Sequence, residues 1–176
     1  MRMNYKTVKI INKLPAKVYS DEKMLPIIKS SREIFEINTT YPKECIEYLQ
    51  HFGIGLLGGL IVIYPPNKSY QLTHEYLNHF LQHKNHLFLI DKSDLIKGNK
   101  AKRVSKSILK SFLFIGRTED GEPFYFDGKY YYINHWSFQP FTLYRIGKTL
   151  DDLFDWYSSG LFVEKTDLSF FKVGCL

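Results

Sequence analysis

The segment that most constrains this fold is the apolar run LIVIY at residues 60–64. In an extended chain, successive side chains point to opposite faces, and here both faces carry only Leu, Ile, Val or Tyr. Because neither face suits water, we predict a strand inside its sheet, covered by other elements on both sides. Pro65 and Pro66 follow the run, and proline does not continue a central strand.

A helix is predicted just before this strand. Pro42 suits the first helical turn, where its missing N–H would have no partner, and Gly53 can take the left-handed conformation that closes a helix. Between them, one apolar face at helical spacing is formed by Cys45, Ile46, Leu49 and Phe52.

Glycines at positions 53, 55, 58 and 59 separate the helix from the strand. A phosphate-binding loop leaves a strand and opens a helix, whose N-terminus holds the anion. Here the glycines leave a helix and enter a strand. We interpret them as a tight bend with close backbone packing, and we predict no nucleotide or other cofactor site.

Residues 112–146 carry the clearest sheet pattern. Three apolar and aromatic segments, at 112–117, 122–126 and 129–133, are separated by the turn sequences TEDG and DG. They predict an antiparallel meander, and residues 141–146 offer a fourth strand.

A capping pair, Thr149 and Asp152, predicts the start of a helix that ends at Gly160. Its buried face is predicted to hold Leu150, Leu153, Phe154 and Tyr157. The carboxylates of Asp151 and Asp152 suit the first helical turn, so the helix dipole explains them without a catalytic role.

Another helix is predicted after an Asn67-Lys68 turn, over residues 71–84. On one of its polar faces, Glu75, His79 and His83 align one turn apart. A zinc site would need a fourth ligand or a supported open position, and neither is evident. We predict exposed polar side chains and no metal site.

The first 40 residues are harder to interpret. Residues 6–14 alternate weakly and suggest an edge strand, whereas residues 30–37 fit either a strand or a helix. Pro15 and Pro26 interrupt this part, and no chemistry is assigned to it.

The length of 176 residues predicts one domain, and the aromatic content of 16% favours a sheet. We therefore expect a single α+β domain, residues 1–176, with a mainly antiparallel sheet of about five or six strands flanked by helices. Only Cys45 and Cys175 occur, and the N-terminus has no continuous apolar stretch. These features predict a reducing, cytoplasmic setting without disulfides. Neither a GxSxG motif nor a cysteine with a local base is present, so no catalytic residue is expected.

The formal net charge of +6 is concentrated in the run KGNKAKRVSKSILK, residues 97–110. Its cations alternate with apolar residues at helical spacing, which is typical of a basic amphipathic helix on a phosphate-rich surface. The alternative is a solvated face or connection. The run holds no aromatic residue for base stacking, and this weakens the case for nucleic acid.

The order of these elements resembles the SUKH superfamily, which comprises bacterial immunity proteins and yeast regulators of cell-wall synthesis. Its pattern has a helix ending in a Phe- or Asn-and-Gly turn, a strand, a hairpin of the type fIGxdxdGdxxxfD and a final helix. The matching positions are Phe52, Gly53, Gly55, Phe114, Ile115, Gly116, Asp120, Gly121, Phe126, Asp127 and residues 150–157. The resemblance covers about residues 41–160, whereas the 1–40 extension and the 91–110 basic connection lie outside the pattern.

The resemblance implies a non-enzyme. Many bacterial members bind and neutralise a cognate toxin, often a nuclease, that is encoded beside them. We therefore expect an immunity protein that occludes the active site of a toxin, with that protein as its partner and no small-molecule substrate. Many such proteins that act on nucleases are acidic, whereas this chain is basic.

Two sets of charged residues are candidate contacts. The acidic hairpin turn, with Glu119, Asp120 and Glu122, suits a basic toxin, and the basic run, with Lys102, Arg103 and Lys106, suits an acidic one. The alternative function is a binding or scaffold protein that uses residues 97–110 on nucleic acid or an anionic membrane.

Overall fold

The computed structural model describes residues 9–10, 20–54, 56–57, 61–82, 88–91, 100, 102–118, 121–135, 142–158 and 169–171. The helices in this part of the chain are α1 (Asp21–Phe35), α2 (Lys43–Phe52), α3 (Pro66–Gln82), α5 (Lys106–Ser111) and α6 (Leu150–Ser158). The strands are β1 (Lys9–Ile10), β2 (Leu56–Leu57), β3 (Ile61–Ile63), β4 (Phe88–Asp91), β5 (Lys102–Arg103), β6 (Leu113–Thr118), β7 (Pro123–Phe126), β8 (Tyr131–His135), β9 (Thr142–Gly147) and β10 (Ser169–Phe171).

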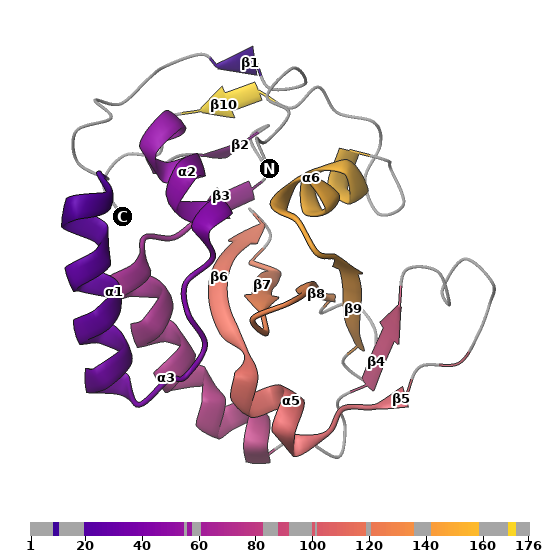
Figure 1. The fold of residues 1–176 in the computed structure, drawn as a ribbon. Helices are drawn as coiled ribbons and strands as arrows, with labels where there is room; N and C mark the ends of the chain where they lie inside the picture. The colour runs from indigo at the N-terminus through magenta and orange to yellow at the C-terminus, as the bar shows by residue number, and fades with distance from the viewer. Residues whose placement is uncertain are drawn as a thin grey trace.

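One sheet joins all these strands in the order β1-β10-β2-β3-β6-β7-β8-β9-β4-β5 (Figure 1). Its pairings are antiparallel except for β1 with β10 and β4 with β9. The predicted α+β class with a mainly antiparallel sheet is confirmed. The sheet has more strands than the expected five or six, because it continues at both ends through strands of two to four residues. Most of these strands are shorter than the about four to eight residues over which alternation can be recognised in a sequence.

Strand β3 lies between β2 and β6, and its three residues are buried, which confirms the strand predicted to be covered on both faces. Ile61 and Ile63 point into one core, and Val62 points into another. We call these the first and the second core. In β6, Leu113 and Ile115 likewise belong to the first core and Phe114 to the second.

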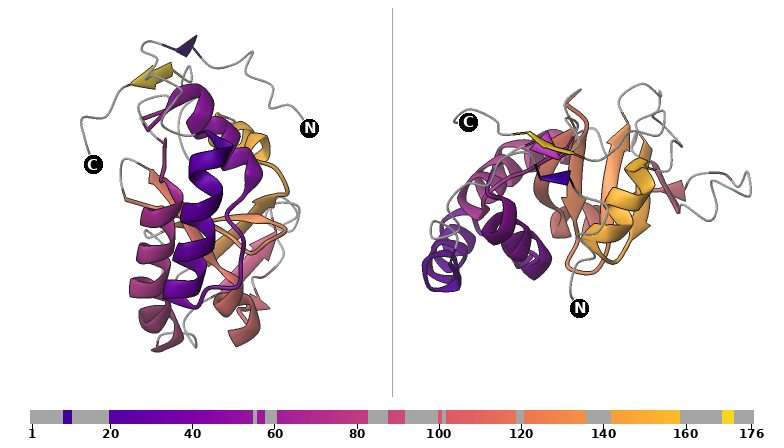
Figure 2. Two further views of the ribbon diagram at one scale, coloured as in Figure 1. Left: turned by 60° about the vertical axis from the view of Figure 1, so that its left-hand side comes forward. Right: turned by 90° about the horizontal axis from the view of Figure 1, so that it is seen from above.

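Helices cover the two faces of the sheet (Figures 1 and 2). Three helices, α1, α2 and α6, cover the first core. Their buried residues include Met24, Leu49 and Leu153. On the second core lie α5 and part of α3, through Leu109 and the half-buried Leu72. Helix α1 packs along α3, and α3 in turn packs against β6. The molecule is therefore layered around β3 and β6.

Two predictions for the first half of the chain are corrected. Helix α3 begins at Pro66, so Asn67 and Lys68 belong to its first turn, which proline tolerates. Helix α1 includes residues 30–35, whose sequence fits either a strand or a helix, and it continues through Pro26. Pro26 is exposed, and Met24, Ile28 and Ser31 on the same helix are buried. Tertiary packing of that face therefore outweighs the cost of one proline. Strand β1 lies at one end of the sheet, within the predicted edge strand.

The predicted helix before β3 and the last capping pair are confirmed. Helix α2 begins after Pro42 and ends before Gly53, whose φ is 72°. At the start of α6, the amide of Asp152 donates to Thr149 Oγ1 at 3.1 Å, and the amide of Thr149 donates to Asp152 Oδ2 at 2.9 Å. Gly160, the side chain of Tyr157 and the glycines at 55, 58 and 59 lie outside the described residues or side chains.

The second turn of the meander differs in detail from the sequence prediction. Phe126 pairs with Tyr131, so four residues, 127–130, connect β7 and β8 instead of two. Gly128 has a φ of 94°, which explains the glycine at this position. The extra residues are held by Asp127, whose Oδ1 accepts from the amides of Lys129 at 2.8 Å and Tyr130 at 2.7 Å.

We expect Gly116→Ala to be strongly destabilising. A Cβ at Gly116 would overlap the carbonyl oxygen of Val62 in the neighbouring strand, and both backbones are fixed by the ladder. Chemical denaturation is expected to show a loss of about 3 kcal/mol or more. Gly121→Ala is the matched control, because its φ of 89° is strained for Ala but a Cβ there meets nothing within 4 Å. It is expected to cost about 1 kcal/mol. Equal losses for both variants would contradict the close approach.

Buried tyrosines make the protein sensitive to alkali. Burial raises the pKa of Tyr70 to about 12, and it also raises the pKa values of Tyr41, Tyr125 and Tyr131. The unfolded chain ionises its tyrosines near pH 10, so stability is complete below that pH and is lost as the pH rises through the raised values. We expect cooperative unfolding above about pH 10, with tyrosinate absorbance and loss of circular dichroism in one transition. Gradual ionisation without loss of structure would contradict this.

Candidate partner-binding surface

The basic run does not form the single amphipathic helix that its spacing suggested. Lys102 and Arg103 form the edge strand β5, which pairs with β4, and Lys106 lies in the short helix α5. The break falls at Val104, which is buried in the second core, and at Ser105, whose Oγ accepts from the amide of Ile108 at 3.3 Å. Burial of Val104 and this N-cap explain why the helix begins only at Lys106.

The cations of the basic run that the structure describes are exposed. These are Lys100, Lys102, Arg103, Lys106 and Lys110. Lys97 lies outside the described residues. On α5, Lys106 and Lys110 are one turn apart, and Leu109 between them points into the second core. The run is thus a solvated surface that extends from the sheet edge to a helix.

Of the predicted acidic turn, the structure describes only Glu122. Its amide donates to Thr118 Oγ1 at 3.0 Å, and its carbonyl oxygen accepts from the amide of Thr118 at 2.9 Å. Burial raises the pKa of Tyr144, and the charge of Glu122 adds to the shift. Strands β8, β9 and β4 separate β7, which follows Glu122, from β5. The structure therefore does not bring Glu122 together with Lys102 and Arg103.

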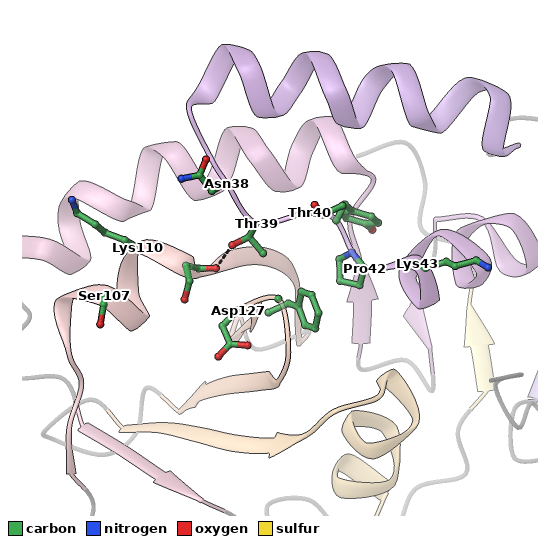
Figure 3. Close-up of a pocket in the computed structure, with 12 residues that line it drawn as sticks. Asn38, Thr39, Thr40, Pro42, Lys43, Ser107, Lys110 and Asp127 are labelled. Carbon is green, nitrogen blue, oxygen red and sulfur yellow. Dashed lines mark hydrogen bonds between the residues drawn. The ribbon is translucent and has the colours of Figure 1, made fainter.

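A polar groove of about 720 Å³ lies beside α5. Three segments line it: residues 38–43, which lead from α1 into the start of α2, one side of α5, and the end of β7 with the turn that follows (Figure 3). Its side chains include Asn38, Thr39, Ser107, Lys110 and Asp127. Local sequence patterns do not reveal this groove, because its walls are far apart along the chain and residues 38–40 carry no motif.

Hydrogen bonds from buried tyrosines fix one wall of the groove. The Tyr70 hydroxyl donates to the carbonyl oxygen of Thr39 at 3.0 Å and accepts from the amide of Tyr41 at 2.9 Å. The Tyr41 hydroxyl donates to the carbonyl oxygen of Tyr64, at the end of β3. Thr39 Oγ1 donates to the carbonyl oxygen of Ser111, which joins this wall to α5 (Figure 3). The wall is therefore tied to α3, β3 and α5.

Asp127 forms the opposite wall, and both of its carboxylate oxygens are engaged. Oδ1 holds the turn amides described above, and Oδ2 accepts from the hydroxyl of Tyr132 at 2.7 Å. Burial raises the pKa of Tyr132, and this hydrogen bond raises it further. Asp127 is the position that matches the closing aspartate of the SUKH hairpin pattern. Its hydrogen bonds give it a structural role in this turn.

The groove offers hydrogen-bond donors and a positive charge from α5. Lys110 contributes an exposed ammonium group, and Thr40 and Ser107 contribute exposed hydroxyl groups. Lys43, at the other end, forms an ion pair of 3.7 Å with Glu47, and its side chain is 83% exposed. Such a set of groups suits carboxylates and backbone carbonyl groups of another protein.

We expect Tyr70→Phe to loosen the groove wall. Removal of one buried hydroxyl leaves the amide of Tyr41 and the carbonyl oxygen of Thr39 without this partner, at an expected cost of about 2–3 kcal/mol in the free energy of unfolding. Amide hydrogen exchange is expected to increase at residues 39–42. Gln71→Ala, on the exposed side of the same helix, is the control and is expected to change neither quantity. An unchanged exchange rate in Tyr70→Phe would contradict the role of this hydroxyl.

None of the helices in the described ranges combines the length and the hydrophobicity that crossing a bilayer requires. Among the same residues, no cluster of three or more His, Cys, Asp or Glu side chains is placed to hold a metal ion. His83 and the side chain of His79 lie outside this description. The chain was compared with family models, with curated proteins and with solved structures, and no match was found in any of the three.

Proposed function

We propose that this chain is a non-catalytic immunity protein of the SUKH type, which acts in the cytoplasm by binding a cognate bacterial toxin and covering its active site. The observation that carries the proposal is the exposed cationic surface of β5 and α5 beside a polar groove with fixed walls. The partner surface that fits it is acidic.

The fixed groove walls favour tight binding. Association costs free energy when loops and side chains are ordered at the interface, and a wall already held by Tyr41 and Tyr70 avoids part of that cost. Exposed cations such as Lys106 and Lys110 also accelerate the encounter with an acidic partner. A neutralising protein needs both properties, because it must reach the toxin before the toxin reaches its target.

The SUKH-like hairpin supports the family part of the proposal. Gly116 matches the glycine of the IG pair, and it permits the close approach of β6 to Val62. Asp127 matches the closing aspartate, and it holds the turn that follows β7. Each residue therefore has a structural role at its position in the SUKH pattern.

A second candidate function is binding to nucleic acid or to an anionic membrane through the basic run. The exposure of Lys102, Arg103 and Lys106 favours it. However, β5 is the edge of the sheet, where charged side chains also prevent pairing with other chains. Salt-sensitive binding to DNA or lipid vesicles distinguishes this candidate from the immunity protein.

Co-expression with the polypeptide encoded beside this gene tests the proposal. We expect rescue of growth and a complex that co-purifies. The double variant Lys102→Glu/Lys106→Glu is expected to weaken the complex by about 10- to 100-fold, because like charges then face the acidic partner. The control Lys23→Glu/Lys29→Glu changes the net charge equally on the exposed side of α1 and is expected to leave the affinity unchanged.

Three outcomes would contradict the proposal. In the first, the neighbouring polypeptide is harmless and forms no complex. In the second, both double variants weaken the complex equally. In the third, the parent chain binds DNA or anionic vesicles with a steep salt dependence, and Lys102→Glu/Lys106→Glu abolishes this binding. The last outcome would establish the second candidate function.

A further inference from the structure

A second cavity, of about 350 Å³, lies on the second-core side of the sheet, apart from the groove. Its walls come from α3 and from strands β6 and β7 together with Tyr64 at the end of β3. They include Tyr64, Lys68, Tyr76, Phe114, Arg117 and Tyr125. We call it the aromatic pocket. It shares no described lining residue with the groove.

The rings in this pocket form an ordered wall. Phe114 stacks with Tyr64 at a centroid distance of 5.7 Å and an interplanar angle of 18°, and with Tyr76 at 5.9 Å and 14°. Tyr125 meets Phe114 edge-on, at 5.6 Å and 76°. Tyr76 is 43% exposed, which is unusual for a large side chain in such a cluster. Tyr64, Phe114 and Tyr125 are buried, so the ring that a planar ligand can stack on is that of Tyr76.

Two cations accompany these rings. Arg117 pairs with Val62 in the β3–β6 ladder, so its side chain leaves the sheet on the face of the second core. Arg117 and Lys68 are both exposed, and both line the pocket. Arg117 interacts with the hydroxyl of Tyr64 and moderates the rise in the pKa of that hydroxyl caused by burial. Among the described lining residues none is acidic.

We propose that the aromatic pocket is a binding site for a small planar aromatic anion, an aryl carboxylate or an aryl phosphate. The ring of the ligand stacks on the exposed ring of Tyr76, and its anionic group pairs with Arg117 and Lys68. The guanidinium group of Arg117 matches the geometry of a carboxylate or a phosphate with two parallel hydrogen bonds. The cavity volume lies within the range of about 300–1,000 Å³ that is usual for small-molecule sites. This proposal is independent of the proposed function.

Amide-correlation NMR spectra of the isotope-labelled full chain test the site. The probes are naphthoate, its neutral counterpart naphthamide, and phenyl phosphate. We expect naphthoate and phenyl phosphate to shift amide signals around Tyr76, Phe114 and Arg117, with dissociation constants of about 1 mM or below. Naphthamide is expected to bind about tenfold more weakly than naphthoate, because it lacks the charge.

Two variants separate the contributions of charge and ring. Arg117→Gln is expected to weaken naphthoate binding about tenfold and to leave naphthamide binding unchanged. Tyr76→Ala is expected to weaken both ligands several-fold, because the exposed ring is lost. Lys110→Gln in the groove is the control and is expected to change neither affinity. The spectrum of each variant without ligand shows whether its fold is intact.

The site is overturned if no probe shifts any signal at about 5 mM, or if the shifted signals lie away from the pocket. It is also overturned if naphthamide binds as tightly as naphthoate, or if Arg117→Gln leaves the affinity for naphthoate unchanged. A negative binding result at the aromatic pocket would not contradict the proposed toxin complex, because that complex is tested separately with variants of β5 and α5.

Discussion

The burial of β6 on both faces is the constraint on which the remaining structure depends. Leu113 and Ile115 require one apolar cover and Phe114 requires another, so the sheet must lie between two sets of helices. The contact between β6 and β3 is close enough that Gly116 has no room for a side chain. Helix α3 follows β3 directly and packs against β6. The contact between β3 and β6 therefore also positions α3, the first helix along the chain that covers the second core.

A single carboxylate connects α2 with α6 and β8 on the first core. Glu44, in the first turn of α2, accepts at Oε2 from the amide of Leu150 at 2.6 Å and from the hydroxyl of Tyr131 at 3.3 Å. It therefore supplies a partner to the N-terminus of α6, which lies 106 positions later in the chain. This contact and the bonds of Tyr70 both hold the chain around the start of α2, and one wall of the groove lies there.

The local sequence was sufficient wherever one residue settles the local conformation. Pro42 and Gly53 delimit α2, Thr149 and Asp152 start α6, and the turn sequences TEDG and DG between apolar segments reveal β6 and β7. The local sequence was not sufficient where tertiary packing decides where a helix or strand begins and ends. Pro26 suggested an interruption inside what is one helix, and Val104 divided a run of cations that looked continuous. The groove was beyond local reasoning, because Thr39 and Ser111, which join its walls, are 72 residues apart.

The same strand leads to both of the surfaces to which we assign binding. At one end of β7, Phe126 and the Asp127 turn line the groove, and along the rest of it Pro123 and Tyr125 line the aromatic pocket. Pairing fixes β7 between β6 and β8, so neither surface can shift without disturbing the central ladder. The hairpin that resembles the SUKH pattern is thus a rigid support. The exposed cations to which we assign binding are Lys110, on the neighbouring helix α5, and Arg117, on β6 of the hairpin itself.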